Sequence, residues 1–171
     1  MTKKKIGGRA DSGFSNTGRT LDSDNHFTRS GKPEVESLAA KTGELVNLLV
    51  EKHWMGIYLC RATGENAVNV DTQMGTQVHL HNTGLGKAVL AHQPESHVKA
   101  ILDRHGMPQM TERMITDRDT LFKRLETIRD RGIAFDDEER LPGLQCVAVP
   151  ILNGDSCAKG ALIVFVTSIY R

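Results

Sequence analysis

The chain has 171 residues, which is enough for one folded domain with a tail or a small additional fragment. Hydrophobic residues make up 39% of it and charged residues 25%, as in ordinary globular proteins, and the net charge of +1 gives no electrostatic reason to expect binding to nucleic acid or membranes. Three cysteines without paired spacing predict a reducing compartment, and the sequence has neither a signal-peptide pattern nor a membrane-spanning run, so we expect a cytoplasmic, soluble protein.

Residues 1–32 differ in composition from the rest of the chain. They are rich in Gly, Ser, Asn, Thr and Asp and contain few apolar side chains, so they cannot bury enough surface to offset the entropy of ordering. We therefore predict a disordered tail or residual linker over residues 1–32. A basic arm for DNA is the less favoured interpretation, because the charges are dispersed. Residues 33–171 are predicted to form one folded domain.

Apolar periodicity and turn residues divide residues 33–171 into helices and strands. Each predicted helix begins at a residue typical of helix starts, namely Pro33, Thr83, Pro94 or Thr116. The predicted helices cover residues 33–42, 83–91, 94–105 and 116–131, and the predicted strands cover residues 45–50, 56–61, 67–70, 76–80, 133–135, 146–152 and 161–167. Since helices and strands are grouped and the strands follow one another as hairpins, this order predicts an α+β fold with a mostly antiparallel sheet.

The glycine-rich segment 84–88 has two possible interpretations. A phosphate-binding loop is excluded, because that motif requires a glycine where His81 stands and a hydroxyl where Ala88 stands. A dinucleotide fingerprint is excluded as well, because Val89 occupies its third glycine position. The start of a helix still offers free amides to an anion or a carbonyl group, whereas the glycines could equally serve close packing of the helix on the sheet.

Cys146 lies on a predicted strand, where it could be a nucleophile, a metal ligand, a pocket wall or part of the core. It shares one face of the strand with Ala148, and the opposite face, with Val147, Val149 and Ile151, is predicted to be the fully buried one. No positive charge lies near Cys146 in the sequence to lower its pKa. On the residues alone, a buried core position is favoured.

An acidic run covers residues 136–139 at the end of a predicted strand. Such runs are usually solvated loops. Asp136 directly follows the apolar Phe135, however, and could point inward to a pocket. A pair of carboxylates for acid–base catalysis would also need an apolar pocket that raises one pKa, which the sequence does not reveal.

Histidines and a tryptophan provide weaker signals. His79 and His81 share one face of a predicted strand, but neither they nor the three cysteines have the spacing of a zinc site, so we expect no metal and no cofactor. Trp54 and Met55 stand at a hairpin tip, where they could pack on a partner subunit or cover the edge of the core.

Five stretches of the chain together resemble the effector-binding domain of the IclR family of transcription regulators, over residues 33–171. They cover residues 38–48, 75–88, 111–116, 125–133 and 136–150. The resemblance implies a twisted antiparallel sheet with flanking helices, related to the GAF and profilin-like folds. It further implies a pocket on the sheet that binds a small-molecule effector. The pocket residues that it implies are Gly84, Leu85, Gly86, Asp136, Cys146, Ile163 and Phe165.

Two features depart from the family pattern. Members that bind small oxo-acids typically carry serines where this chain has Ile163 and Phe165, which cannot donate to a carboxylate, so we expect a larger or aromatic, partly apolar acid. Residues 1–32 cannot form the winged helix-turn-helix domain that precedes this domain in full-length members. We therefore expect DNA contact only through a domain not present in this chain.

The family resemblance predicts a sensor that binds an effector without turnover and self-associates as a dimer or tetramer. A docking module without a ligand is the first alternative. An enzyme that uses Cys146 with Asp136 and a histidine is the less favoured one, because no activated nucleophile with a positioned base is evident. We expect no enzymatic activity.

Overall fold

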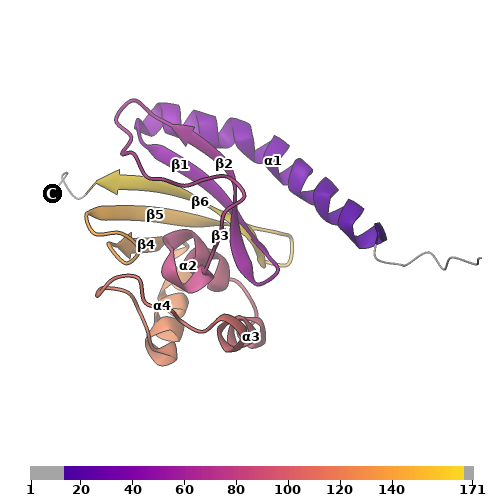
Figure 1. Ribbon diagram of the computed structural model, residues 1–171, viewed down its shortest axis with the longest axis vertical. Coiled ribbons are helices and arrows are strands. Elements are labelled where there is room, and N and C mark those ends of the chain that lie inside the picture. Colours follow the sequence, from indigo (N-terminus) through magenta and orange to yellow (C-terminus); the bar gives the residue numbers. More distant parts are fainter. Residues whose placement is uncertain (1–13, 168–171) are drawn as a thin grey trace, which may run out of the picture.

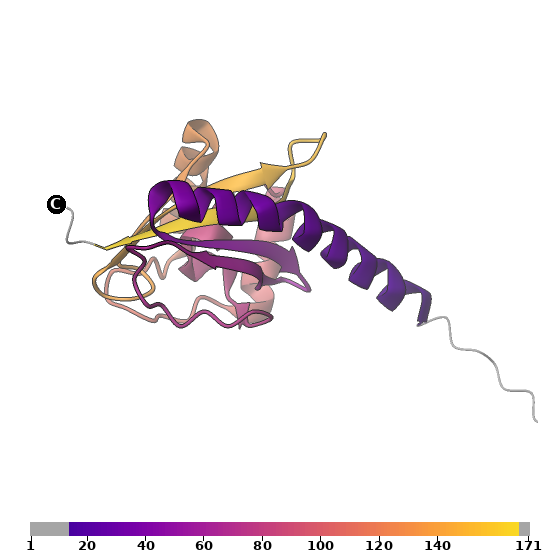
Figure 2. The same ribbon diagram turned by 90° about the horizontal axis from the view of Figure 1, so that it is seen from above.

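The computed structural model describes the backbone of residues 14–167 and the side chains of residues 26–166. Helix α1 (Phe14–Thr42) lies across β1 (Leu45–Lys52) and β2 (Met55–Thr63), and its N-terminal part projects past the sheet (Figures 1 and 2). Val35 and Ala39, one turn apart, are buried against these strands because they share one face of the helix.

The start of this first helix differs from the sequence prediction. Pro33 was expected to open it, but Pro33 lies inside α1, which runs back to Phe14. The apolar contacts of the helix explain part of this extension, because Phe27 packs against the same cluster as Leu38. Of the predicted tail, residues 1–13 lie outside the described residues. The helix ends as predicted at Gly43, which has a positive φ of 74° and donates its N–H to Ala39 at 2.9 Å.

The sheet has six strands in the order β3-β2-β1-β6-β5-β4, and each neighbouring pair is antiparallel. The remaining strands are β3 (Gln77–Val78), β4 (Ala134–Asp137), β5 (Leu144–Leu152) and β6 (Ala158–Thr167). The predicted α+β fold is confirmed. The strand predicted at residues 67–70 is wrong, because this segment forms no ladder, and the one predicted at 76–80 is shortened to β3.

Three helices cover the face of the sheet opposite α1 (Figure 1). They are α2 (Gly84–Leu90), α3 (Glu95–His105) and α4 (Arg118–Arg131), close to the predicted positions. A single-turn 3-10 helix, η1 (Leu80–Asn82), leads into α2. The larger core cluster lies between these helices and the sheet, and the smaller one lies under α1.

The buried face of β5 is the opposite of the one that the sequence predicted. Cys146 and Ala148 are 4% and 0% exposed and belong to the larger core, whereas Val149 is 39% exposed. The reason is that α2 packs over the Cys146 face, while α1 covers β1 and β2 and leaves the other face of β5 partly open. The prediction that Val147, Val149 and Ile151 form the fully buried side is therefore wrong.

Candidate functional site

The start of α2 meets the inner face of β4, β5 and β6, and the strand register gathers side chains there. Asp136 is directly opposite Cys146, and Cys146 is directly opposite Phe165, so all three stand side by side on one face of the sheet. One cavity forms at this place. Its walls are Tyr58, Thr83, Gly84, Asp136, Arg140, Leu141, Leu144, Cys146, Ile163 and Phe165.

Gly84 brings the backbone of α2 into close contact with this wall. A Cβ added there would lie 3.2 Å from Asp136 Cβ, 3.4 Å from Ile163 Cδ1 and 3.5 Å from Cys146 Sγ. The Gly84 N–H donates to Asp136 Oδ2 at 3.1 Å, and Thr83 caps the helix by accepting from the Gly86 N–H at 2.9 Å. The amide of Gly84 is thus already bound by an internal carboxylate, and not free as the helix-start interpretation assumed.

Asp136 is an inward-pointing carboxylate, 2% exposed. Its Oδ1 accepts the Glu139 N–H at 3.0 Å, so the acidic run turns back over it. Burial raises the pKa of Asp136 above its usual value, while the Lys87 ammonium acts in the opposite direction. Burial, reinforced by Asp136, raises the pKa of the Cys146 thiol well above its usual value, which keeps the sulfur protonated and unsuited to nucleophilic attack.

Two residues of the predicted site lie elsewhere. Leu85 is fully buried in the helix–sheet core and does not line the cavity. A Cβ on Gly86 would lie 2.0 Å from the carbonyl oxygen of Leu80, so Gly86 serves the close approach of α2 to η1. The packing interpretation of the glycines therefore applies to Gly86.

Several residues of the site were not singled out from the sequence. Lys87 is completely buried, and its Nζ lies 2.5 Å from Glu139 Oε1. Lys87 stands in an otherwise apolar helix, a signal that its ammonium needs an internal partner. Tyr58 and Arg140 line the cavity as well. Burial raises the pKa of Tyr58, and the positive charge of the Arg140 guanidinium opposes this rise.

The cavity is nearly closed in this structure. The volume open to the centre of a water molecule is about 10 Å³, room for about one water. Arg140 and Leu141 also line an outer groove of about 750 Å³ whose other walls include residues 109–113. The turn that carries Arg140 and Leu141 therefore separates the inner cavity from a wide surface groove.

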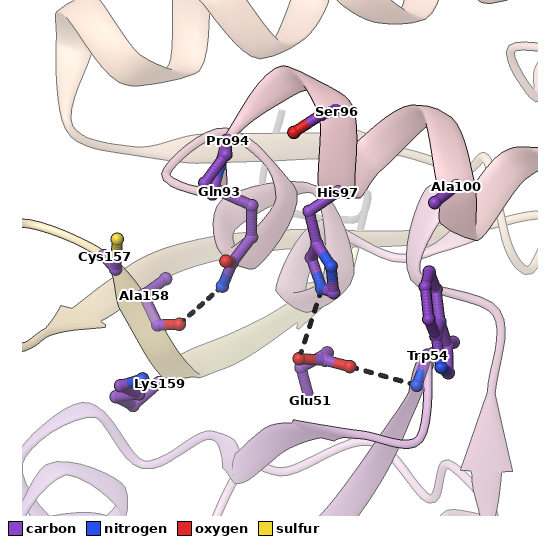
Figure 3. Close-up of a pocket in the computed structure, with 10 residues that line it drawn as sticks. All are labelled: Glu51, Trp54, Gln93, Pro94, Ser96, His97, Ala100, Cys157, Ala158 and Lys159. Carbon is purple, nitrogen blue, oxygen red and sulfur yellow. Dashed lines mark hydrogen bonds and ion pairs between the residues drawn. The ribbon is translucent and has the colours of Figure 1, made fainter.

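A second open cavity, of about 620 Å³, lies at the other end of the sheet (Figure 3). Three of its polar side chains, those of Glu51, His97 and Gln93, already have partners within the chain. Glu51 accepts the Trp54 N–H at 3.0 Å and approaches His97 Nε2 to 3.6 Å, and Gln93 donates to the carbonyl of Ala158 at 2.7 Å. The rings of Trp54 and His97 are 5.2 Å apart, so Trp54 packs on α3 of its own chain.

The histidines form a loose cluster beside η1. The ring of His79 lies 5.7 Å from that of His81 and 5.9 Å from that of His105. Within the described part of the chain, no group of three or more His, Cys, Asp and Glu side chains has an arrangement that could hold a metal ion. None of the helices in this described part is both long and apolar enough to cross a membrane.

The family model described as "Bacterial transcriptional regulator IclR C-terminal" matches residues 20–170. The HTH-type transcriptional regulator BhcR of Paracoccus denitrificans is 35% identical over 129 residues, which cover 74% of this chain and 46% of that protein. Among solved structures, the C-terminal domain of Escherichia coli KdgR has a TM-score of 0.75 at 26% identity, covering 84% of this chain and 82% of that one. The IclR structure of Thermotoga maritima has a TM-score of 0.77 at 27% identity, covering 88% and 63%. The chain spans about half the length of the curated relatives that it matches.

Proposed function

This chain belongs to the IclR family of bacterial transcription regulators, as its C-terminal effector-binding domain, and we propose that a small molecule bound in the cavity at the start of α2 controls operator binding by the whole regulator. Binding to DNA would go through a winged helix-turn-helix domain, in the bacterial cytoplasm. The ligand would act by favouring one arrangement of those DNA-binding domains over another.

One observation carries the choice of this cavity. Gly84, Asp136, Cys146, Ile163 and Phe165, which come from four separate elements, converge on a single small space. In contrast, the larger cavity at Trp54 contains none of these residues, and its Glu51 and Gln93 are engaged within the chain.

The walls favour an aromatic or partly apolar acid. Ile163 and Phe165 form a floor that offers no hydrogen bonds, and Leu141 and Leu144 add further apolar surface. Because the closed cavity has room for about one water, an effector must enter by displacing the turn that holds Arg140 and Leu141. Binding is thereby coupled to a movement of that turn.

The relatives are named as transcription regulators, and the chain is a regulatory domain and not an enzyme. The buried thiol agrees with this, because its raised pKa opposes thiolate formation.

Self-association is a further part of the proposal. Ile133, Phe135 and Val149 are 46%, 45% and 39% exposed, on or next to β4 and β5. A dimer or tetramer that covers them would remove this apolar surface from water. Sedimentation equilibrium of wild type and Phe135→Glu tests it: the oligomer should weaken in the variant, and a monomeric wild type would contradict it.

The division of the chain is also proposed: residues 33–171 as the effector-binding unit, and residues 1–32 as a tail or linker. The part of α1 that precedes Pro33 would then act as a lever between this unit and the DNA-binding domain.

A thermal-shift screen tests the proposed function. The panel contains oxo-acids, hydroxy-acids, aromatic acids and sugar acids, with Cys146→Ser and Asp136→Ala beside wild type. A ligand at 100 times its dissociation constant adds about 2.7 kcal/mol of stability, which gives a clear shift. Ser96→Trp, placed at the rim of the larger cavity, is the control and should bind like wild type.

The outcomes separate the two cavities. A shift that Cys146→Ser and Asp136→Ala weaken and Ser96→Trp retains supports the cavity at α2. A shift that only Ser96→Trp removes would move the site to the Trp54 cavity. No shift with any compound would leave the docking-module alternative ahead.

A further inference from the structure

The charges around the proposed effector cavity are distributed unequally between its two ends. At the inner end, the carboxylate of Asp136 occupies the Gly84 amide, and Glu139 lies nearby, paired with Lys87. These groups form a set of internal partners. A ligand carboxylate placed there would compete with Asp136 for the same N–H and would stand beside its negative charge.

The outer end carries the guanidinium of Arg140, in a groove that Glu112 and Glu138 also line. Arg140 lines the inner cavity and also the outer groove, and it is half-buried. Within the described part of the chain it forms no ion pair, whereas Arg113 on the same groove is bound to Asp137 at 2.9 Å. The phenol of Tyr58, 2% exposed, lines the same inner cavity as Arg140, and the positive charge of Arg140 opposes the rise in the phenol's pKa that burial causes.

Between these ends, the walls are apolar: Ile163, Phe165 and Leu144 are almost completely buried. A ligand that matches the apolar walls and the guanidinium at the outer end has an apolar ring and an anionic group at one end. Guanidinium groups hold carboxylates in two-point contact, and this interaction strengthens where water is partly excluded.

Resting on the proposed function, we infer that the effector binds with its carboxylate held by Arg140 at the mouth of the cavity, and with its ring directed inward to Ile163 and Phe165. The inner groups Gly84, Asp136 and Cys146 then contact the opposite end of the ligand. Arg140 is in this way the residue that selects acids over neutral compounds, and its turn closes on the ligand that it binds.

Isothermal titration calorimetry with matched probes tests this orientation. The probes are benzoate, 4-hydroxybenzoate and phenylacetate, each compared with its neutral primary amide. The proteins are wild type, Arg140→Gln, Arg140→Lys and Arg113→Gln, each checked for an unchanged melting temperature. Arg113→Gln is the matched control, because it removes a guanidinium from the same outer groove.

We expect at least one acid to bind wild type about 10- to 100-fold more tightly than its amide, the range that a charge-assisted hydrogen bond supplies. Arg140→Gln should lose this preference for the acid, because binding of the acid weakens while binding of the amide does not change. Arg140→Lys should retain part of the preference. Arg113→Gln should keep the ratio of acid to amide affinity within about threefold of the wild-type ratio. Equal binding of acid and amide, or an unaffected acid affinity in Arg140→Gln, overturns the inference while the effector site stands.

Failure of all six probes also overturns the inference as stated for ring acids. The broader thermal-shift panel then decides separately on the proposed function. A compound of another class that stabilises the protein would support the site, and the absence of any stabilising compound would argue against it.

Discussion

Lys87 and Glu139 form an ion pair inside the domain, with Nζ and Oε1 2.5 Å apart and side chains that are 0% and 6% exposed. The backbone N–H of Glu139 donates to Asp136, so the same residue ties α2 to the turn over the cavity. A buried pair of this kind repays the cost of removing its charges from water only while both partners are present.

Removal of one partner should therefore be far more costly than removal of both. Lys87→Met should lower the free energy of unfolding by about 3–5 kcal/mol, because it leaves the Glu139 carboxylate buried and unpaired. The double variant Lys87→Met/Glu139→Leu should recover most of this loss. Urea unfolding of wild type, both single variants and the double variant measures the coupling, and additive single effects would contradict it.

Gly84 and Gly86 should respond differently to the same substitution. Alanine at Gly84 places a methyl group 3.2–3.5 Å from Asp136, Ile163 and Cys146, so we expect lost effector binding at a stability cost of about 1–3 kcal/mol. Alanine at Gly86 meets the backbone of Leu80, which cannot move aside, and should cost more than about 3 kcal/mol. Urea unfolding and ligand titration distinguish the two. Normal binding by Gly84→Ala would place the ligand elsewhere.

How far the sequence anticipates this structure depends on the range of the interactions involved. The start of α2 was predicted from its local cap, and Thr83 does accept the N–H of Gly86. The start of α4 was predicted one residue early, at Thr116, whereas the cap is Asp117, which accepts the N–H of Thr120. The convergence of Asp136 and Cys146 on one cavity was anticipated through the family resemblance, and their strand register accounts for it.

Long-range contacts explain what was missed. Which face of β5 is buried depends on the packing of α2, and alternation alone gives two equivalent faces. The fully buried face was therefore wrongly assigned to Val147, Val149 and Ile151, although the buried core position favoured for Cys146 is confirmed. The partner of Lys87 lies on a turn far along the chain, and no local pattern reveals that Glu139 would meet it. Likewise, Pro33 is a residue typical of helix starts, yet α1 begins before it. The segment ahead of Pro33 contacts the sheet through Phe27, and this long-range contact cannot be read from the local sequence.

The three cysteines should react at very different rates with iodoacetamide. Burial raises the pKa of both Cys60 and Cys146, whereas Cys157 is half-exposed in the turn before β6. Because the thiolate is the reacting form, we expect Cys157 to be labelled at least about tenfold faster than the other two at pH near 8. Peptide mass spectrometry over time measures this, with Cys157→Ser as the control. Fast labelling of Cys146 would reopen the enzyme alternative.

Acidification should destabilise the domain through the histidine cluster. Burial lowers the pKa of His81 below 6.5, so the folded state keeps the ring neutral while the unfolded chain takes up the proton. The contribution of His81 is thus present above pH 6.5 and is lost as the pH falls through the lowered pKa. His79 acts in the same direction, for the same cause.

Unfolding by urea at about pH 7.5 and about pH 5 tests this, with His81→Gln as the comparison, since glutamine can still donate to the Pro108 carbonyl that His81 reaches at 3.3 Å. Wild type should lose more stability than the variant between the two pH values. Asp136, whose raised pKa gives the opposite trend, is common to both proteins and cancels. Equal losses would show that His81 does not carry the effect.

The part of α1 before Pro33 should contribute measurably to stability. Phe27 packs against the smaller core cluster, and its ring atoms lie 3.1 Å and 3.3 Å from where a Cβ on Gly160 would be. The Cys60 thiol, 3.7 Å from the carbonyl of Thr28, marks a second contact of this segment with β2. Phe27→Ala should lower the free energy of unfolding by about 1–3 kcal/mol, because the substitution removes a half-buried ring and the apolar surface that it buries against the cluster.

His26→Ala is the matched control, since His26 is the exposed neighbour on the same helix and its removal should change stability by less than about 0.5 kcal/mol. Urea unfolding of the two variants decides between a docked helix and a free tail. If residues 1–32 were a disordered tail in solution, Phe27 would make no lasting contact with the sheet, and both variants would match wild type. A loss confined to Phe27→Ala instead shows that the linker before Pro33 is docked on the sheet as part of α1, so that a movement at the sheet can be transmitted along this helix.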